Sequence, residues 1–423
     1  LGLIIIDEEH ESSFKQFEPS PRYHARAVGQ MLARVHNSKV LLGSATPSVE
    51  TYFLARSGKY GLAELSERYG TANLPVIEFA DTKKERRQQT LKSDFTSVLY
   101  EKLNQALANK EQAIIFRNRR GYSPHLSCED CTWIPKCENC AVSLTYHMHK
   151  GILQCHYCGF KEKVPHSCPA CGSSRLKGVG FGTEKLEEDL KLFFPDSNIR
   201  RMDLDTTRRK YSYQQIIGDF EKGDIDILVG TQMVSKGLDF ENVQLVGVMD
   251  ADVMLHFPDF RAYERTFQLL TQVSGRAGRR EKPGIVIIQT GNPGQQVLEW
   301  VKQGDYESLY KFEIGERQKF RYPPFFRLIK IILKHKEKDI CDRSAMHLGS
   351  LLKAELGSAL VIDPHEPMVA RIKNKYLMEI LIKIPRSKIS LPAVKNIIKN
   401  KSMEIMGHKD FKQVHIVFDV DPV

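Results

Sequence analysis

Acidic side chains directly follow an apolar run at the start of this sequence. Residues 3–6 read LIII, and Asp7, Glu8, Glu9 and His10 follow without a break. A carboxylate at the carboxyl end of a buried strand can hold magnesium through its water shell, and a second carboxylate can polarise a water that attacks a phosphate. The same acids could instead complement a helix dipole. The run therefore indicates phosphate chemistry only if other phosphate-binding residues accompany it.

Eight of the nine cysteines lie between residues 128 and 171, as four C-x-x-C pairs. Each pair can hold one side of a tetrahedral zinc ion, so eight thiols make two closed, structural sites. Tight pairs in a large, lysine-rich chain indicate metal ligands in a reducing cytoplasm, not disulfides. An iron–sulfur cluster could use four of the thiols. The predicted zinc ligands are Cys128, Cys131, Cys137, Cys140, Cys155, Cys158, Cys168 and Cys171.

The four pairs can be combined into two sites in three ways. Sequential pairing leaves five residues between Cys131 and Cys137, which is tight for a ribbon. Nested pairing leaves 14 residues between Cys140 and Cys155, enough for a hairpin, and joins the first pair to the last. Crossed pairing also fits the spacing, so the sequence leaves both nested and crossed pairing open.

Residues suited to phosphates follow other predicted strands. GSATPS, at 43–48, comes after the apolar run 39–42 and supplies Ser44 and Thr46. VGTQMVSKGLDFENV, at 229–243, follows a third strand with glycines and hydroxyls. TQVSGRAGRR, at 271–280, places two arginines three residues apart, so both can face one phosphate. The candidates from this last segment are Gln272, Arg276 and Arg279.

Aromatic and basic residues alternate in HESSFKQFEPSPRYHAR, at 10–26. Aromatic rings can stack on bases while cations neutralise phosphates, which is typical of single-strand binding. The rings could instead be core contacts of the following helix. We interpret the segment as a DNA-binding loop whose candidate residues are Phe14, Lys15, Phe17, Arg22 and Tyr23.

Strands and helices alternate along most of the chain, which predicts an α/β fold with parallel sheets. The segment 82–93 (TKKERRQQTLKS) is polar, and we expect its first part, TKKERRQQ at 82–89, to be solvated and flexible. Beyond RYPPFFR, at 321–327, the order strand, helix, two strands, helix, strand indicates a ferredoxin-like unit of about 100 residues. Predicted strands are 3–6, 39–42, 76–80, 113–116, 225–230, 243–252 and 284–290, and predicted helices are 23–34, 95–107, 183–194 and 262–273.

Composition limits the class of protein. The 423 residues are 41% hydrophobic and 27% charged, with a formal net charge of +10 and a pI near 9.0. No apolar run approaches the roughly 18 residues that a membrane span needs. The positive charge favours an anionic partner, and nucleic acid first.

The motifs together resemble a known family. DEEH, GSATPS, GTQMVSKGLDF and QVSGRAGR resemble motifs II, III, V and VI of superfamily 2 helicases, and the cysteine pairs make the chain similar to the primosomal replication-restart helicases. The resemblance implies RecA-like helicase lobes, the first of them truncated, with a zinc-ribbon-like insertion and a C-terminal ferredoxin-like α+β domain. The expected boundaries are 1–72 for the first lobe, 73–310 for the second lobe, 123–178 for the insertion and 311–423 for the last domain.

The resemblance also implies roles for individual residues. Asp7 would organise magnesium, Glu8 would activate water, and Arg279 would be an arginine finger beside Arg276. The cofactors would be ATP with Mg²⁺ and two structural zinc ions, and the resemblance favours the nested pairing. The nucleotide side of the second lobe would include Gly237 and Asp239.

The function implied is an ATP-dependent 3′–5′ DNA helicase that recognises stalled or forked DNA and initiates primosome assembly. Its partners would be forked and single-stranded DNA, single-strand-binding protein, other primosome proteins and the machinery that loads the replicative helicase, in the cytoplasm and with no membrane. One alternative is a structure-specific DNA-binding scaffold with a weak or idle motor. Another is a double-strand translocase that does not separate strands.

One motif of these helicases does not occur. No G-x-x-x-x-G-K-[ST] string, which would cradle the nucleotide phosphates, is present in the sequence. We therefore expect this chain to be a C-terminal fragment that has little ATPase activity alone.

Overall fold

The structure is a computed structural model. It describes residues 1–65, 75–118, 125–139, 142–147, 151–155, 159–179, 183–203, 212–234, 240–278, 283–386, 389–411 and 413–422. The chain forms two compact units. Unit 1 contains residues 1–62, 136–163 and 310–423, and unit 2 contains residues 63–135 and 164–309. No helix in the described ranges is long and apolar enough to cross a membrane.

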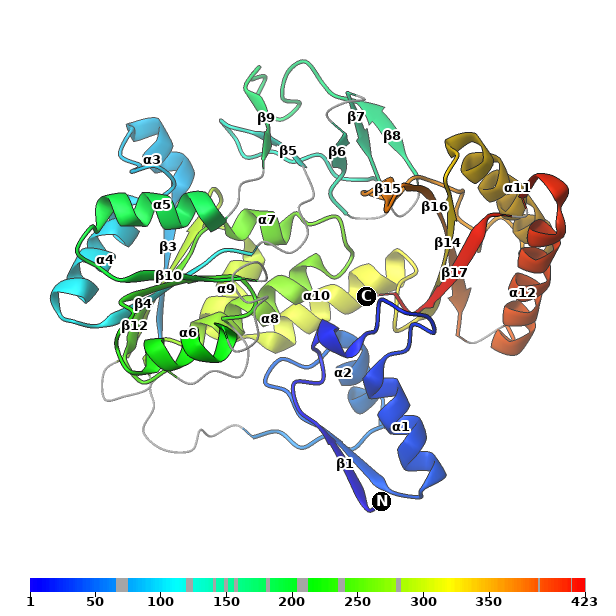
Figure 1. The fold of residues 1–423 in the computed structure, drawn as a ribbon, viewed down its shortest axis with the longest axis horizontal. Helices are drawn as coiled ribbons and strands as arrows, with labels where there is room; N and C mark the ends of the chain where they lie inside the picture. The colour runs from blue at the N-terminus through cyan, green and yellow to red at the C-terminus, as the bar shows by residue number, and fades with distance from the viewer. Residues whose placement is uncertain are drawn as a thin grey trace. The chain divides into compact units, whose positions relative to one another are not determined.

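Unit 2 is built on a six-stranded sheet in the order β10-β11-β4-β12-β13-β3 (Figure 1). Every neighbouring pair is parallel. Parallel strands need crossover connections, which helices supply here. The strands are β3 (Val76–Asp81), β4 (Gln112–Phe116), β10 (Ile199–Met202), β11 (Ile227–Gly230), β12 (Val243–Val248) and β13 (Ile285–Thr290).

Each face of this sheet has its own apolar core, because successive side chains of a strand point to opposite faces. Ile114 of β4 belongs to the core that also contains side chains of α6, α8 and α9. Its neighbour Ile115 belongs to the core formed with α4 and α5. The helices of unit 2 are α3 (Thr82–Gln88), α4 (Ser97–Ala108), α5 (Thr183–Phe193), α6 (Ser212–Glu221), α7 (Ala251–Leu255), α8 (Ala262–Ser274) and α9 (Gln296–Gln303).

Residues 1–62 of unit 1 form a small α/β element. Its two strands pair in parallel, with Leu3 opposite Lys39 and Ile6 opposite Leu42. The elements are β1 (Leu3–Ile6), η1 (Ser12–Phe14), α1 (Ala25–Val35), β2 (Lys39–Leu42) and α2 (Val49–Arg56).

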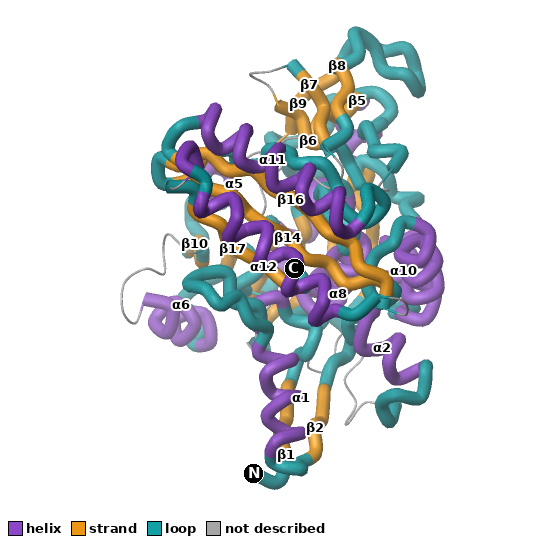
Figure 2. Tube along the Cα trace, turned by 90° about the vertical axis from the view of Figure 1, so that its right-hand side faces the viewer, coloured by secondary structure: helices purple, strands orange, loops and turns teal. Residues whose placement is uncertain are grey.

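The last part of unit 1 is an antiparallel sheet in the order β15-β16-β14-β17. Helices α11 and α12 cover one face of this sheet (Figure 2). The chain order is the βαββαβ predicted for a ferredoxin-like unit. The elements, with the preceding helix, are α10 (Tyr306–Lys319), β14 (Phe326–His335), α11 (Lys338–Leu356), β15 (Arg371–Ile372), β16 (Lys375–Pro385), α12 (Leu391–Gly407), η3 (Lys409–Phe411) and β17 (His415–Val420).

Helix α2 packs against this C-terminal region. The guanidinium of Arg317 on α10 lies 3.3 Å from the carboxylate of Glu50. The ring of Tyr52 meets that of Tyr310 edge-on, with centroids 4.8 Å apart. Segments that the sequence predicted as separate domains, at the two ends of the chain, therefore share one compact unit.

The cysteine block contributes strands to both units. In unit 2, β5 (His125–Cys128) pairs antiparallel with β9 (Leu176–Val179). In unit 1, β6 (Thr145–His147), β7 (Ile152–Gln154) and β8 (Lys161–Lys163) form an antiparallel sheet. The single insertion expected at 123–178 is thus divided between the two units.

The fold class expected from the sequence is confirmed, but two elements differ from the predictions. Residues 82–88, expected to be flexible, form α3, and the carboxylate of Asp81 caps this helix by accepting a hydrogen bond from the backbone N–H of Lys84. Such a cap stabilises the first turn of a polar helix. Strand β10 was not predicted, because its sequence IRRM has only two apolar residues.

Candidate phosphate and zinc sites

Asp7 and Glu8 follow β1 directly, at the carboxyl end of the strand. Asp7 is exposed and the Glu8 side chain is 42% exposed, so both carboxylates can reach a ligand from solvent. Glu8 has a φ of 48°, in the left-handed region that side chains other than glycine rarely adopt. Backbone strain of this kind concentrates at functional sites, where surrounding contacts maintain it. Glu8 is therefore a candidate functional residue, and its catalytic role stays a prediction.

The loop after β2 is hydrogen-bonded to this acidic strand end. The backbone N–H of Gly43 donates to the carbonyl of Ile6 at 2.9 Å, and the N–H of Glu9 donates to the carbonyl of Gly43 at 3.0 Å. His10 Nδ1 lies 2.7 Å from Ser44 Oγ, which also accepts from the N–H of Thr46 at 3.0 Å. The structure therefore brings the predicted Ser44 and Thr46 next to the acidic run.

Glu9 is a residue of this site to which the sequence assigned no role. Its side chain is buried, and its carboxylate accepts hydrogen bonds from the backbone N–H of Ser48 at 2.6 Å and from Thr51 Oγ1 at 2.9 Å. Arg26 of α1 forms an ion pair with it. Glu9 thus joins the loop after β1 to α1 and to the start of α2. Adjacent acids in a sequence cannot be separated by pattern, so only the structure distinguishes Glu9 from Glu8.

We expect Glu9→Gln to destabilise residues 1–62 by about 2–3 kcal/mol, because it leaves the Arg26 charge without its partner in a site of limited solvent access. Hydrogen exchange of the α1 and α2 amides measures the change in local opening free energy. The matched control is Glu8→Gln, which removes the same charge from a half-exposed side chain and should shift exchange by less than about 0.5 kcal/mol. Equal exchange rates in the two variants would contradict the structural role of Glu9.

Two of the phosphate-binding candidates in unit 2 lie at the end of α8. Gln272 is in the last turn of this helix and Arg276 is in the turn that follows it, and both side chains are partly exposed. The predicted residues Gly237, Asp239 and Arg279 lie outside the described residues. All five stay predictions.

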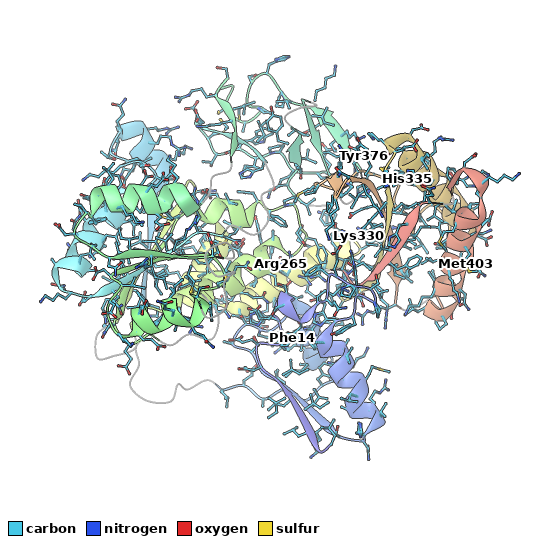
Figure 3. The ribbon with its side chains drawn as sticks, in the orientation of Figure 1. Phe14, Arg265, Lys330, His335, Tyr376 and Met403 are labelled. Carbon is cyan, nitrogen blue, oxygen red and sulfur yellow. The ribbon has the colours of Figure 1, made fainter. Side chains whose placement is uncertain are left out.

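In the aromatic loop, residues 10–24, the aromatic rings and the cations differ in their exposure to solvent. Phe17 and Tyr23 are 52% and 46% exposed, and Phe14 is partly buried (Figure 3). In contrast, the side chains of Lys15 and Arg22 are only 1% and 11% exposed, because they pair with an acid of the last strand. The rings are available for stacking on bases, whereas a phosphate could contact these two cations only after that pairing opens. DNA contact by the five residues stays a prediction.

Four cysteine sulfurs converge in unit 2. The Sγ atoms of Cys128, Cys131, Cys168 and Cys171 all lie within 4.8 Å of one another. The Sγ–Sγ distance is 3.6 Å between Cys128 and Cys171 and 3.4 Å between Cys131 and Cys168. A tetrahedral Zn²⁺ with Zn–S bonds of about 2.3 Å needs sulfurs about 3.8 Å apart. The four thiols fit zinc, and the first pair meets the last as the nested pairing requires.

The thiols of this outer zinc site do not titrate alike. Although burial opposes ionisation, hydrogen bonds from the backbone N–H groups of Cys131 and Asp130 lower the pKa of the Cys128 thiol to about 7. Burial raises the pKa of the Cys131 thiol to about 12. Zinc binds thiolates. The Cys128 thiol therefore ionises readily, whereas the Cys131 thiol loses its proton only when zinc binds.

The inner zinc site is described in part. In the outer site, the N–H of Gly172 donates to the carbonyl of Cys168, and the N–H of Gly159 repeats this contact with Cys155 in unit 1. Both glycines have positive φ angles, 75° and 76°, which close the turn after each cysteine. Cys140 and Cys158 lie outside the described residues, so the second zinc ion stays a prediction.

A cavity of about 200 Å³ with several charged lining residues lies at the carboxyl ends of β12 and β13 in unit 2. Burial, with a smaller effect of the neighbouring Asp252, raises the pKa of Asp250 to about 7. Asp250 and Asp252 lie at the end of the predicted strand 243–252. They could have been noted as candidates, because ligands of open parallel sheets bind beyond the carboxyl ends of the strands. The charged lining residues are Lys83, Arg86, Asp94, Arg117, Glu129, Lys177, Asp250 and Asp252.

The parallel sheet, the acidic strand end and the cysteine site define a class of protein: chains with RecA-like α/β lobes that carry a zinc-ribbon region. Residues 181–281 match the helicase conserved C-terminal domain. Residues 137–163 match the PriA DNA helicase Cys-rich region domain, and residues 318–423 match the primosomal protein N C-terminal domain. The chain belongs to the PriA family of replication restart proteins.

Curated members of this family match the whole chain. The replication restart protein PriA of Bacillus subtilis is 43% identical over 422 residues, which are 100% of this chain and 51% of the relative. That of Synechocystis is 39% identical, with coverage of 100% and 51%, and that of Haemophilus influenzae is 36% identical, with coverage of 100% and 56%. The chain thus spans about half the length of these relatives. Among solved structures, RecG bound to a three-way DNA junction aligns with a TM-score of 0.39 at 15% identity, over 76% of this chain and 30% of RecG.

Proposed function

We propose that the full-length protein containing this chain is an ATP-dependent DNA helicase that moves 3′ to 5′, recognises stalled or forked DNA and initiates primosome assembly. Family membership supports the replication-restart role. The observation that supports the motor is the hydrogen bonding of Ile6, Glu9 and His10, which flank Asp7 and Glu8, to the loop of Gly43 and Ser44 at the carboxyl ends of two parallel strands. Acids and hydroxyls meet there, at the edge of a parallel sheet where phosphate ligands bind.

The roles of the site residues form part of the proposal. Asp7 holds the hydrated magnesium ion of bound ATP, and Glu8 accepts the proton of the attacking water. Ser44 and Thr46 connect the nucleotide site to the rest of the first lobe. In the second lobe, Arg279 stabilises charge that develops on the transferred phosphoryl group, with Arg276 beside it. The nucleotide contacts of this lobe are Gly237, Asp239 and Gln272.

DNA and protein partners complete the proposal. The exposed rings of Phe17 and Tyr23 stack on bases of the translocated strand. The zinc block meets forked DNA or a partner such as single-strand-binding protein, another primosome protein or the loading machinery of the replicative helicase. The site of action is the cytoplasm. A strand-separation assay on forked DNA, compared with a translocation assay on duplex DNA, distinguishes this helicase from a translocase that leaves strands paired.

The isolated chain should bind DNA, and DNA should stimulate its ATP hydrolysis by less than about 2-fold. The sequence holds no glycine-rich loop with a lysine to cradle the nucleotide phosphates. Its net charge of +10 should still bind DNA, with an affinity that falls as salt rises. Steady-state ATPase with and without forked DNA, and DNA binding at two salt concentrations, check both points, with the full-length protein as the positive control. Strong stimulation of the chain alone would place the phosphate-binding site elsewhere.

A further inference from the structure

A single carboxylate of the C-terminal domain neutralises both inner cations of the aromatic loop. Asp419 is in β17, the last strand, and its side chain is 6% exposed. One carboxylate oxygen lies 2.8 Å from Lys15 Nζ, and the other accepts a hydrogen bond from Arg22 Nη1 at 3.3 Å. All three residues belong to unit 1, and Figure 1 shows the C-terminal end of β17 beside the loop that precedes α1.

Lys15 is held by more than this ion pair. Its ammonium group also donates to the backbone carbonyl of Val420 at 2.6 Å and to that of Arg22 at 3.3 Å. Two carbonyl acceptors and the carboxylate of Asp419 therefore surround the ammonium group. Because the side chain is 1% exposed, solvent screens these contacts little. The inner contact therefore holds the loop firmly to the end of β17.

A second contact between the loop and the C-terminal domain is weak by comparison. The carboxylate of Glu18 lies 4.0 Å from Lys334 Nζ and 3.8 Å from Lys373 Nζ. The Glu18 side chain is 65% exposed, and exposed ion pairs of this length contribute little. Among the described residues, the ion pairs of Asp419 and the hydrogen bond from Lys15 to the Val420 carbonyl are thus the stronger attachment of the loop to the C-terminal domain.

The held loop is continuous with the acidic strand end. The N–H of Glu11 donates to the carbonyl of Glu8 at 2.9 Å, and the N–H of Phe14 donates to the carbonyl of Glu11. Lys15 follows in the next position. Two hydrogen-bonded turns therefore connect the position of Lys15 to the backbone of Glu8.

We propose that Asp419 is a positioning residue, which holds the aromatic loop in its DNA-free arrangement, and that phosphates of single-stranded DNA displace Asp419 from Lys15 and Arg22. This inference rests on the proposed function and adds a means by which the C-terminal domain controls it. DNA gains two cationic contacts only in the released arrangement, so its binding shifts the loop toward release. The carboxylate of Asp419 and the phosphates of DNA thus compete for the same two cations.

The principal test is Asp419→Asn in the full-length protein. We expect the concentration of single-stranded DNA that half-maximally stimulates ATP hydrolysis to fall by about 5-fold or more, the usual lower range of such coupling. Turnover at saturating DNA should stay within about 2-fold of wild type, since saturating DNA releases the loop in either protein. Asp419→Glu, which keeps the charge, should restore the wild-type DNA requirement. Asp421→Asn, which removes an acid two residues along the chain, is the matched control and should change neither value.

A second variant, Arg22→Gln, tests separately whether DNA displaces Asp419. This test remains possible even if Asp419→Asn does not fold. Arg22→Gln leaves Asp419 paired with Lys15. If the phosphate takes Arg22 in the bound state, the slope of log affinity for single-stranded DNA against log salt should decrease by about 0.7. If Arg22 stays with Asp419 when DNA binds, the slope will not change, and the proposal is wrong. Thermal unfolding confirms that each variant is folded.

The outcomes separate this inference from the proposed function. Wild-type protein without DNA-stimulated ATPase would contradict the proposed function. Normal stimulation of the wild type, together with an unchanged DNA requirement in folded Asp419→Asn, would overturn the role of Asp419 alone. A lower turnover at saturating DNA in that variant would also overturn it, because Asp419 would then be needed in the active arrangement.

Discussion

Removal of zinc from the outer cysteine site is expected to unfold the cysteine block of unit 2 while its six-stranded sheet stays folded. Strands β5 and β9 share only four residue pairs, and few apolar side chains are buried between them. A metal must then supply most of the folding free energy, and structural zinc contributes about 10–16 kcal/mol to such modules. The sheet has two apolar cores that contain none of the cysteine ligands, so it does not depend on the metal.

The two tryptophans of the chain allow the two regions to be followed separately. Trp133 is in the cysteine block, two residues after the ligand Cys131, and Trp300 is in a core of the sheet, on α9. In a Trp300→Phe variant, a chelator should change the fluorescence of Trp133 as zinc leaves. In a Trp133→Phe variant, the same chelator concentration should leave the fluorescence of Trp300 unchanged. Parallel changes in both variants would show that the block and the sheet fold as one.

The zinc content of the protein and its variants tests how many zinc ions the cysteines bind. Wild-type protein should contain two zinc ions per chain, and Cys168→Ser should contain one. Cys341→Ser is the matched control, because Cys341 is a buried thiol of the C-terminal domain, apart from the cysteine block, and should leave the content at two. One zinc ion or none in carefully prepared wild-type protein would contradict the eight-ligand assignment.

Glu8→Gln in the full-length protein should lower ATP turnover by about 10²–10⁴-fold, the usual contribution of a positioned general base. Glutamine keeps the shape of the side chain but cannot accept the proton of the attacking water. Because the Glu8 side chain is 42% exposed and its contact with His10 Nδ1 is long, at 3.5 Å, folding stability should hardly change. ATP binding should also persist, since Asp7 still holds the magnesium ion.

Steady-state kinetics separate this role from substrate binding. A loss confined to kcat supports a group that acts in the transition state, whereas a rise in KM alone would assign Glu8 to ground-state binding. Arg279→Ala should show the same pattern, with a loss of about 10³-fold or more, the scale of an arginine finger. Glu9→Gln is the contrasting variant: its expected defect is in folding stability, so turnover per folded molecule should be nearly normal.

Local pattern was sufficient for most of the architecture. Apolar runs of four to eight residues, alternating with helical periodicity, indicated β4, β11, β12 and β13 and the helices α4, α5 and α8 between them. The runs are continuous because both faces of a parallel sheet are buried. Elements without such a run were missed: β10 is half basic, and the polar helix α3 is defined by its cap at Asp81 rather than by an apolar face.

The candidate chemistry was predictable for the same reason: the residues that carry it are adjacent in sequence. The C-x-x-C pairs, the acids after β1 and the Ser44 loop can be recognised because each functional group lies within a few residues of its neighbours. The sequence did not decide which of the groups that are distant along the chain pair with each other. Spacing alone allowed both nested and crossed zinc sites, and the convergence of Cys128 and Cys131 with Cys168 and Cys171 appeared only in three dimensions.

By itself, then, the sequence determined the α/β class, the cysteine pairs as candidate zinc ligands and the acidic motif, because each depends on short-range periodicity or spacing. The tertiary structure decided which acid is buried and which is accessible, since burial depends on what the fold packs against each side chain. It also decided that the cations of the aromatic loop, Lys15 and Arg22, are paired with Asp419. Lys15 and Asp419 are 404 residues apart in sequence, a separation at which no local pattern reports a contact, and folding places them 2.8 Å apart in one buried ion pair.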